Sequence, residues 1–191
     1  MKPLAAAALL SLLCGCASLT FGDGGLHQKG DRMFVVGGFT GEPIVGKALA
    51  WVGEGDVPNK GIIIHNYVFL QDRVAIGAGI DLTQWNVHSD RVPGFDIEGK
   101  ARYYFVDVGG AGIFGDFNAG VNIGRTKIPP DGSRKSYSFA FGLGAELPFD
   151  EAASVLVGGE FHHISNARGR YATDNPSQNE GLFWVGVGFR W

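Results

Sequence analysis

The sequence predicts an all-β fold, an eight-stranded antiparallel transmembrane β-barrel. Three observations predict it. Apolar and polar residues alternate along eight segments, long and short connections alternate between these segments, and the chain ends on an aromatic residue, Trp191. Period-two alternation is the pattern of strands with one apolar and one polar face. An even number of such strands with alternating connection lengths is typical of outer-membrane barrels.

Composition excludes several other classes of protein. The chain has 191 residues, enough for one domain, with 45% hydrophobic and 18% charged residues and a formal net charge of -3. This balance is unlike that of a disordered tail, and it offers no basic surface for nucleic acid. Both cysteines lie among the first 16 residues. The rest of the chain therefore has no disulfide, no cysteine-based metal site and no catalytic thiol.

The first 18 residues are typical of a secretory signal peptide, with Lys2 followed by a short apolar run. The run ends in residues 13–16, Leu-Cys-Gly-Cys, which resemble a bacterial lipobox with cleavage before Cys16. Cys14 departs from the usual small residue, so ordinary signal cleavage without a lipid is the alternative. We expect residues 19–30 to be a periplasmic linker and residues 31–191 to form the barrel.

The alternation is clearest in the central segments. In residues 95–105 the odd positions are mostly apolar and four of the even positions are charged, and residues 113–123 and 137–147 repeat the pattern. The eight predicted strands, in chain order, are residues 32–40, 61–70, 74–86, 95–105, 113–123, 137–147, 153–165 and 181–191. Most are longer than the five or six residues usual in soluble sheets and suit tilted strands that cross a bilayer. The polar face would then fill the interior.

The connections predict the orientation. We expect long connections at residues 41–59, around 88–92, at 126–135 and at 167–179, and short turns near residues 71–73, 108–110 and 148–151. Outer-membrane barrels have long loops outside and short turns in the periplasm. Both termini are therefore expected in the periplasm. The last four residues, Gly-Phe-Arg-Trp, are similar to the assembly signal of outer-membrane proteins.

A secreted β-sandwich or a lipocalin-like barrel is the alternative fold, with the apolar face inward and the charged face in water. Alternation alone does not decide between them, because inverting the barrel exchanges the two faces. The aromatic carboxy terminus, the many Phe residues on one face and the absence of disulfides favour the membrane barrel.

Two polar residues interrupt an apolar face. In residues 153–165 the odd positions are apolar up to Phe161, and then His163 and Ser165 follow on the same face. Their Cβ atoms would lie about 6.5 to 7 Å apart. A serine and a histidine within reach of each other form a nucleophile and its general base. The alternative is a polar band at the membrane interface.

The same stretch carries a family resemblance. Residues 163–167, His-Ile-Ser-Asn-Ala, followed by residues 179–181, Asn-Glu-Gly, resemble the motif of the lipid A 3-O-deacylase (PagL) family, also described as acyloxyacyl hydrolase-like. The resemblance implies an eight-stranded outer-membrane enzyme, a carboxylic ester hydrolase. It would remove the acyl chain at the 3-position of lipid A without a metal or other cofactor.

The resemblance also implies roles for individual residues. Ser165 would be the nucleophile and His163 its general base. Asn166 and the backbone N–H of Ala167 would bind the oxyanion. Asn179 would match the loop asparagine of the family.

The chain departs from the family at the acidic residue. The family has a Glu two residues after the Gly of the second motif, and here that position is Phe183. We expect Glu180 to orient His163 in its place, and Asp174 is a second candidate. Loss of catalysis is the alternative, which would leave a barrel with a structural, adhesion or lipid-binding role.

The remaining polar residues suggest no second site. His162 and His163 point to opposite faces and cannot bind one metal ion together, and His65 and His88 lack partners within their own strands. Six residues are expected to form a salt-bridged structural core: Asp96, Glu98, Lys100, Arg102, Asp116 and Glu146. The expected partners are lipid A or lipopolysaccharide, with residues 168–170 against its phosphates, and the outer membrane. The sequence leaves a homodimer open.

Overall fold

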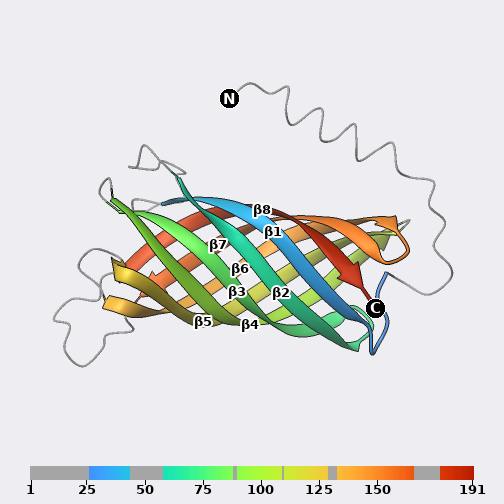
Figure 1. Cartoon of the computed structure of the whole chain (residues 1–191). Helices are drawn as coiled ribbons and strands as arrows, with labels where there is room; N and C mark the ends of the chain where they lie inside the picture. The colour runs from blue at the N-terminus through green and yellow to red at the C-terminus, as the bar shows by residue number, and fades with distance from the viewer. Residues whose placement is uncertain (1–25, 44–57, 88–89, 109, 129–132, 166–176) are drawn as a thin grey trace, which may run out of the picture.

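The computed structural model describes residues 26–43, 58–87, 90–108, 110–128, 133–165 and 177–191. These residues form a closed antiparallel barrel in which each strand pairs with the next and β1 pairs with β8 (Figure 1). The strands are β1 (Arg32–Pro43), β2 (Asn59–Gln71), β3 (Val74–Val87), β4 (Asp90–Val108), β5 (Ala111–Ile128), β6 (Ser133–Asp150), β7 (Ala153–Ser165) and β8 (Ser177–Arg190). The predicted fold class is confirmed. No helix in the described part is long and apolar enough to cross a membrane.

Most of the strands extend beyond their predicted limits. β3 runs to Val87, which pairs with Asp90 at the start of β4. The long connection expected around residues 88–92 is therefore wrong, because the hairpin closes over two residues. β8 begins at Ser177, so Asn179 and Glu180 lie in the strand and follow its alternation. Because of this extension, Asn179 stands opposite His163 and Glu180 stands opposite His162 on β7.

The two ends of the barrel differ as the connections predict. The carboxy terminus and the turns β2–β3, β4–β5 and β6–β7 lie at one end (Figure 1). We call this the turn end. The opposite end, which we call the loop end, carries the connections β1–β2, β3–β4, β5–β6 and β7–β8. In outer-membrane barrels the turn end faces the periplasm and the loop end faces the outside.

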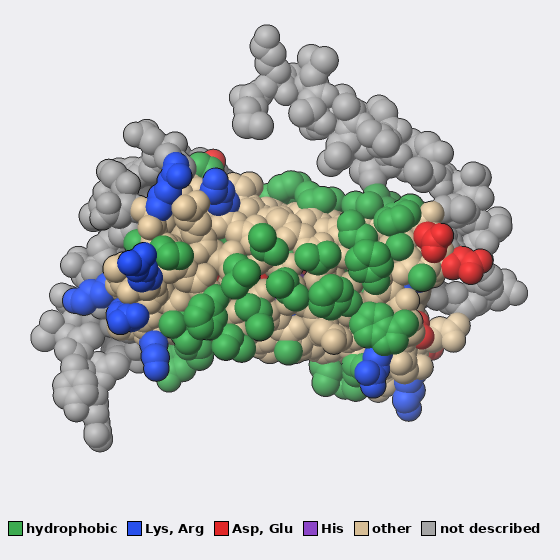
Figure 2. All heavy atoms as spheres, in the orientation of Figure 1, with side chains coloured by type: hydrophobic (Ala, Val, Ile, Leu, Met, Phe, Trp, Pro, Cys, Tyr) green, Lys and Arg blue, Asp and Glu red, His purple; other side chains and the backbone are tan. Residues whose placement is uncertain are grey.

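The outer wall is apolar and the interior is polar. Ile97, Phe117 and Leu143 are 52%, 53% and 65% exposed and belong to the apolar outer wall. Figure 2 shows hydrophobic side chains spread over one face of this wall. On β4 the alternate residues, Asp96 and Glu98 among them, point inward and are buried. A lipocalin-like carrier would have the opposite arrangement, so that alternative is wrong. A wall of large apolar side chains is stable in lipid and costly in water.

The interior has three layers. At the turn end an apolar layer includes Met33, Tyr67, Phe69, Tyr104, Phe114, Leu156 and Trp184. At the loop end a second apolar layer consists of Trp85, Val92, Ile128 and Ile164. Charged and amide side chains fill the space between these layers, which we call the polar middle, and it includes His65, Asp96, Glu98, Lys100, Asn118, Glu160 and His162. The barrel interior is thus filled by side chains, as expected for eight strands.

Part of the predicted linker packs into the turn end. His27 stacks on Phe69 with ring centroids 4.0 Å apart, and its Nε2 lies 2.9 Å from Oε2 of Glu146. The carbonyl oxygen of Leu26 accepts a hydrogen bond from Arg190 Nη1 at 2.9 Å. The segment just before β1 is therefore anchored to the barrel. The predicted signal peptide, Cys16 and linker residues 19–25 lie outside the described residues.

Candidate functional site

His163 and Ser165 lie on the outer face of β7, at the loop end. Their neighbours along the strand, His162 and Ile164, are buried in the interior. Ser165 pairs with Tyr137 of β6, which is 61% exposed on the outer wall. Since residues directly opposite each other on paired strands share a face, Ser165 also belongs to the outer wall. Its side chain is covered there, with only 8% of the residue exposed.

His163 is held by a neighbour on each side. In the pairing of β6, β7 and β8 it stands opposite Phe139 and Asn179. The imidazole packs against the Phe139 ring at 4.8 Å between centroids, and Nδ1 lies 2.6 Å from Oδ1 of Asn179. An amide oxygen only accepts, so Nδ1 carries the proton and donates it. In the neutral ring Nε2 then keeps its lone pair. This is the tautomer that a general base acting through Nε2 requires.

His163 and Ser165, the proposed base and nucleophile, are two residues apart on β7. This spacing sets their Cβ atoms about 6.5 to 7 Å apart. Ser165 lies nearer the loop end than His163, because β7 ends at Ser165. A lone pair on Nε2 directed along the strand would accept the hydroxyl proton of Ser165. Among the described residues no hydrogen bond joins the two side chains, so a change of rotamer would be needed to bring Oγ of Ser165 to Nε2 of His163.

The structure does not bring Glu180 to His163. Glu180 is fully buried inside the barrel, where its carboxylate accepts hydrogen bonds from the side-chain amides of Asn59 and Gln178. It pairs in register with His162, and Oε2 lies 3.7 Å from Nδ1 of that ring. The expectation that Glu180 orients His163 fails because β8 already alternates at this position. Asn166, Ala167 and Asp174 lie outside the described residues.

The family position of the acid is also distant from His163. Phe183 is on the outer wall, 50% exposed, and pairs with Gly159. It lies four residues along β8 from Asn179, which is about 13 Å. A carboxylate at position 183 in this register would not reach the imidazole. The amide of Asn179 is the group that orients the ring here.

The interior contains salt bridges among the residues that the sequence predicts, and also histidine–carboxylate pairs that the sequence analysis missed. Lys100 Nζ lies 3.0 Å from Glu98 Oε2, and Arg102 donates two hydrogen bonds of 2.7 Å to Asp116. His65 Nε2 lies 2.7 Å from Asp81 Oδ1, a partner that the sequence of its own strand does not show. The partner is on the neighbouring strand and depends on the register of β2 and β3. His88 lies outside the described residues.

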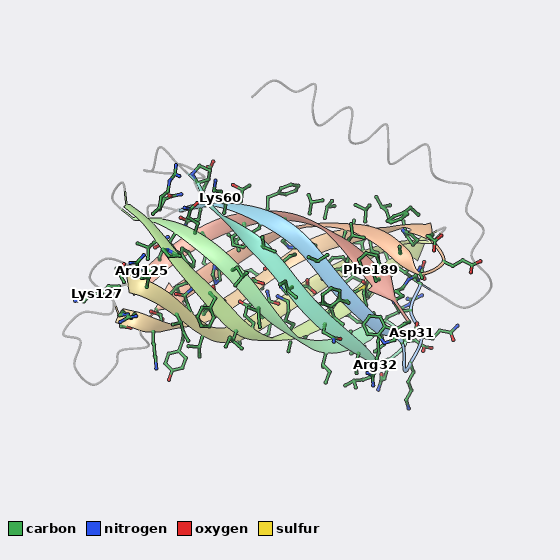
Figure 3. All side chains as sticks on the ribbon, in the orientation of Figure 1. Asp31, Arg32, Lys60, Arg125, Lys127 and Phe189 are labelled. Carbon is green, nitrogen blue, oxygen red and sulfur yellow. The ribbon has the colours of Figure 1, made fainter. Side chains whose placement is uncertain are left out.

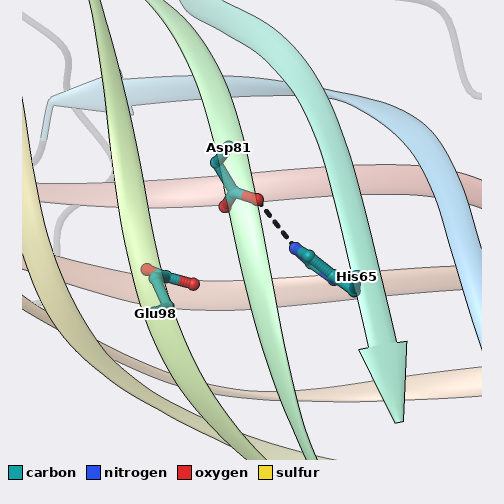
Figure 4. A group of neighbouring side chains, drawn as sticks. All are labelled: His65, Asp81 and Glu98. Atoms are coloured by element: carbon teal, nitrogen blue, oxygen red, sulfur yellow. Dashed lines mark hydrogen bonds and ion pairs between the residues drawn. The ribbon is translucent and has the colours of Figure 1, made fainter.

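Two groups of side chains in the polar middle have the composition of metal sites. One consists of His65, Asp81 and Glu98 (Figure 4), and the other of Asp96, Glu98 and His162. In each group the three potential ligand atoms lie within 4.8 Å of one another. Glu98 belongs to both. The sequence suggested neither group, because their members come from four different strands.

Basic side chains gather at the loop end (Figures 2 and 3). The exposed members are Lys60, Arg91, Arg125, Lys127, Arg134 and Lys135, which we call the basic rim. Lys135 lies on the outer face of β6 two residues beyond Tyr137, on the loop-end side of the Tyr137–Ser165 pair. Cations in this place suit an anionic headgroup held next to the outer wall.

Comparison with known proteins supports the fold. No family model matches the chain, and no curated protein matches it. Solved structures do match, among them the following three. The amino-terminal β-barrel domain of Pseudomonas aeruginosa OprF is 16% identical, over 86% of this chain and 100% of that one, with a TM-score of 0.56.

Two further matches are also distant in sequence. Neisserial surface protein A is 12% identical, over 83% of this chain and 95% of that one, with a TM-score of 0.54. The outer membrane protein OprG of Pseudomonas aeruginosa is 11% identical, over 86% of this chain and 97% of that one, with a TM-score of 0.53. Sequence identities this low support a shared fold and do not indicate a shared function. The chain has the fold of the eight-stranded outer-membrane β-barrels.

Proposed function

We propose that the protein is an outer-membrane esterase that removes an ester-linked acyl chain from lipid A, at the 3-O position. Ser165 is the nucleophile and His163 is its general base. One observation carries the proposal: His163, with Nδ1 bonded to Asn179, lies on the lipid-facing wall two residues before Ser165. The resemblance of residues 163–167 and 179–181 to the lipid A 3-O-deacylase motif names the substrate.

The reaction proceeds by acyl transfer to the enzyme. His163 Nε2 takes the hydroxyl proton of Ser165 as Oγ attacks the ester carbonyl. The tetrahedral intermediate then expels the sugar hydroxyl, which receives that proton from His163. In the second half, water attacks the acyl-serine, His163 takes a proton from it, and the free fatty acid leaves as Ser165 regains its proton. Asn166 and the N–H of Ala167 remain the predicted oxyanion donors.

Asn179 replaces the missing acid in part. Its Oδ1 fixes the tautomer and the orientation of the His163 ring. It supplies no negative charge to stabilise the imidazolium that forms in each half-reaction. A histidine–asparagine pair of this kind also serves cysteine proteases. We therefore expect a turnover lower than that of a carboxylate-containing site.

The surroundings of the site suit a substrate that is itself a membrane lipid. Tyr137 and Phe139 flank Ser165 and His163 on β6 and present apolar surface to acyl chains. The basic rim begins with Lys135 just beyond Tyr137 and matches the phosphates of lipid A. The ester, which joins the acyl chain to the headgroup, would then lie at the depth of Ser165.

The test is mass spectrometry of lipid A after incubation with the protein refolded in detergent. We expect the parent protein to remove one hydroxyacyl chain and Ser165→Ala to leave the lipid intact. Ser138→Ala is the matched control, because Ser138 lies next to Tyr137 but points into the barrel and is 4% exposed. Intact lipid A with a correctly folded parent protein would refute the proposal.

The alternative is a non-catalytic barrel with a structural, adhesion or lipid-binding role. One observation favours it. Within the part of the chain that the structure describes, neither position suggested for the acid provides one, because Glu180 points inward and residue 183 is Phe. Lipid A that binds to the parent protein but remains uncut would support this alternative.

A further inference from the structure

The interior of the barrel contains more carboxyl groups than Lys and Arg side chains. Among the described residues, six carboxylates are buried: Asp96, Glu98, Asp116, Glu146, Glu160 and Glu180. The side chain of Asp81 is a seventh, at 15% exposure. The buried cationic side chains are Lys100 and Arg102. Buried carboxylates are stable when they are protonated, paired with a cation or bound to a metal ion, and histidines face three of them. A further cation would stabilise those that remain charged and unpaired.

The excess is concentrated where β3, β4 and β7 face one another. Asp81 and Asp96 stand directly opposite each other in the β3–β4 register. Like charges in this relation destabilise a sheet. Glu98 follows Asp96 on the same face of β4, and His162 reaches the pair from β7. Three carboxylates and an imidazole are thus gathered in one place away from water.

The free atoms in this place are suited to coordination. His162 is 5% exposed, and neither of its ring nitrogens has a hydrogen-bond partner among the described residues. Its nearest carboxylate outside the group is Glu180, whose Oε2 lies 3.7 Å from Nδ1, beyond hydrogen-bond distance. Asn122 donates to Oδ2 of Asp96 at 2.9 Å and leaves Oδ1 without a partner. Lys100 binds Oε2 of Glu98. Buried polar atoms without partners call for an explanation, and a bound ion is one such explanation.

We propose that Asp96, Glu98 and His162 bind one divalent transition-metal ion inside the barrel. The three ligand atoms lie within 4.8 Å of one another. Bonds of about 2.1 Å would need only small movements of the side chains toward the ion. Imidazole favours Zn²⁺ and related ions, whereas carboxylates also suit Mn²⁺. The mixed set therefore selects Zn²⁺ or Mn²⁺ over Ca²⁺, which takes oxygen ligands.

The second group, His65, Asp81 and Glu98, lies next to the proposed site and shares Glu98 with it. His65 Nε2 is already engaged by Asp81 at 2.7 Å (Figure 4), so this pair is satisfied without a metal ion. Gly79, which stands opposite both His65 and Glu98, leaves the space that the His65 ring occupies. A Cβ there would lie 2.6 Å from Cδ2 of the ring. We therefore place His65 and Asp81 beside the ion and not among its ligands.

A metal ion in this position would tie β4 to β7 across the interior. Ions that bind the folded state alone raise its stability in proportion to the logarithm of their concentration. The site is separate from the outer-wall esterase, so its role is structural. The expectation of no metal from the sequence concerned the reaction, and this site takes no part in it.

The test uses the full chain refolded in detergent with EDTA, freed of chelator and then given Zn²⁺ or Mn²⁺. After gel filtration, metal content is measured by mass spectrometry, bound Mn²⁺ by electron paramagnetic resonance, and the unfolding midpoint by circular dichroism. We expect about one ion per folded chain and a higher midpoint with metal. Ca²⁺ should give neither result.

Variants identify the ligands. His162→Gln and Asp96→Asn should each weaken metal binding by at least about tenfold, the loss seen even for outer-shell partners. Two matched controls should keep the ion. His163→Gln removes the adjacent imidazole from the opposite face, and Glu160→Gln removes a buried carboxylate outside the group.

Several results would overturn the proposal. The first is a folded parent protein that retains no metal ion. The second is a Glu160→Gln variant that loses as much metal as His162→Gln does. The third is loss of metal in His65→Gln when His162→Gln keeps it. Should His162→Gln not fold, the parent titration and Asp96→Asn decide the question. Hydrolysis of lipid A is measured on the same samples, and a failed esterase would leave the metal result standing.

Discussion

The imidazole rings of His162 and His163 lie on opposite sides of the barrel wall. His162 is buried in the polar middle beside Glu180, whereas His163 is on the outer wall and bonds to Asn179. The two pairs are consecutive rungs of the same β7–β8 ladder. Adjacent residues of β7 thus belong to two separate sites, one inside the barrel and one on its outer wall. Substitutions of the two histidines should therefore have separable effects.

Asn179 is the residue whose replacement should most directly reveal how His163 is oriented. Asn179→Leu removes the acceptor of the 2.6 Å bond to Nδ1. We expect kcat for lipid A deacylation to fall on the order of a hundredfold, the lower range for loss of general-base function. Asn179→Asp keeps the acceptor and adds charge that stabilises the imidazolium, so kcat should rise. A lower kcat for Asn179→Asp than for the parent would contradict this role.

Restoring the family acid at position 183 should not increase activity. In the observed register Phe183 pairs with Gly159, and about 13 Å of strand separates it from the level of His163. Phe183→Glu is therefore expected to leave kcat unchanged and to place a charge on the lipid-facing wall. Deacylation rates of Phe183→Glu and Phe183→Gln, measured side by side, test this. A gain limited to the Glu variant would show a different register of β8.

Lys135 should contribute to binding of the lipid A phosphates. It is the basic-rim residue next to Tyr137 on the outer face of β6. Lys135→Gln should raise KM several-fold with little change in kcat, since it removes binding common to substrate and transition state. Arg32→Gln is the control, because Arg32 is exposed at the turn end (Figure 3). Equal effects of both substitutions would rule out a local contribution.

Arg102 should be the most important cation for stability. It is 1% exposed, bonds to both carboxylate oxygens of Asp116 and lies over the Phe114 ring at 3.8 Å. Arg102→Met leaves Asp116 charged and unpaired, which costs about 3–5 kcal/mol in the free energy of unfolding. Combining it with Asp116→Leu should recover much of that loss. Urea unfolding of the refolded barrel, followed by tryptophan fluorescence, measures both.

His27 should stabilise the barrel from outside the strands. Its contacts with Glu146 and Phe69 close the turn end. His27→Ala leaves the buried Glu146 with one partner fewer, so we expect a loss of about 1–3 kcal/mol in the free energy of unfolding. Gln28→Ala alters an exposed side chain next to it and serves as control. Equal unfolding midpoints for the two variants would show that the segment contributes nothing.

The strands and the two faces of the wall were predictable because alternation is a local property. Residues 95–105 alone show which side chains face lipid and which face the interior. The same reasoning places His163 and Ser165 on one face. The limits of the strands were less predictable, since pairing continues past the apolar alternation wherever a partner strand is present. That extension turned Glu180 away from His163.

Contacts between strands could not be predicted from one strand at a time. The bond between His65 and Asp81 depends on the register of β2 against β3, and the approach of His162 to Asp96 depends on closure of the barrel. Asn179 was noted only as a loop residue, although it stands directly opposite His163. The only sign of the two interior side-chain groups in the sequence was that charged residues recur at inward positions of several strands.

The two apolar layers of the interior bear on the permeability of the membrane that holds this barrel. Met33 and Phe114 belong to the layer at the turn end, and Trp85 and Ile164 belong to the layer at the loop end, all with at most 1% exposure. A hydrated solute or ion crossing the lumen would have to shed its water at both layers. Planar bilayers containing the protein should therefore show no unit conductance, and a cell could hold many copies of it without leakage.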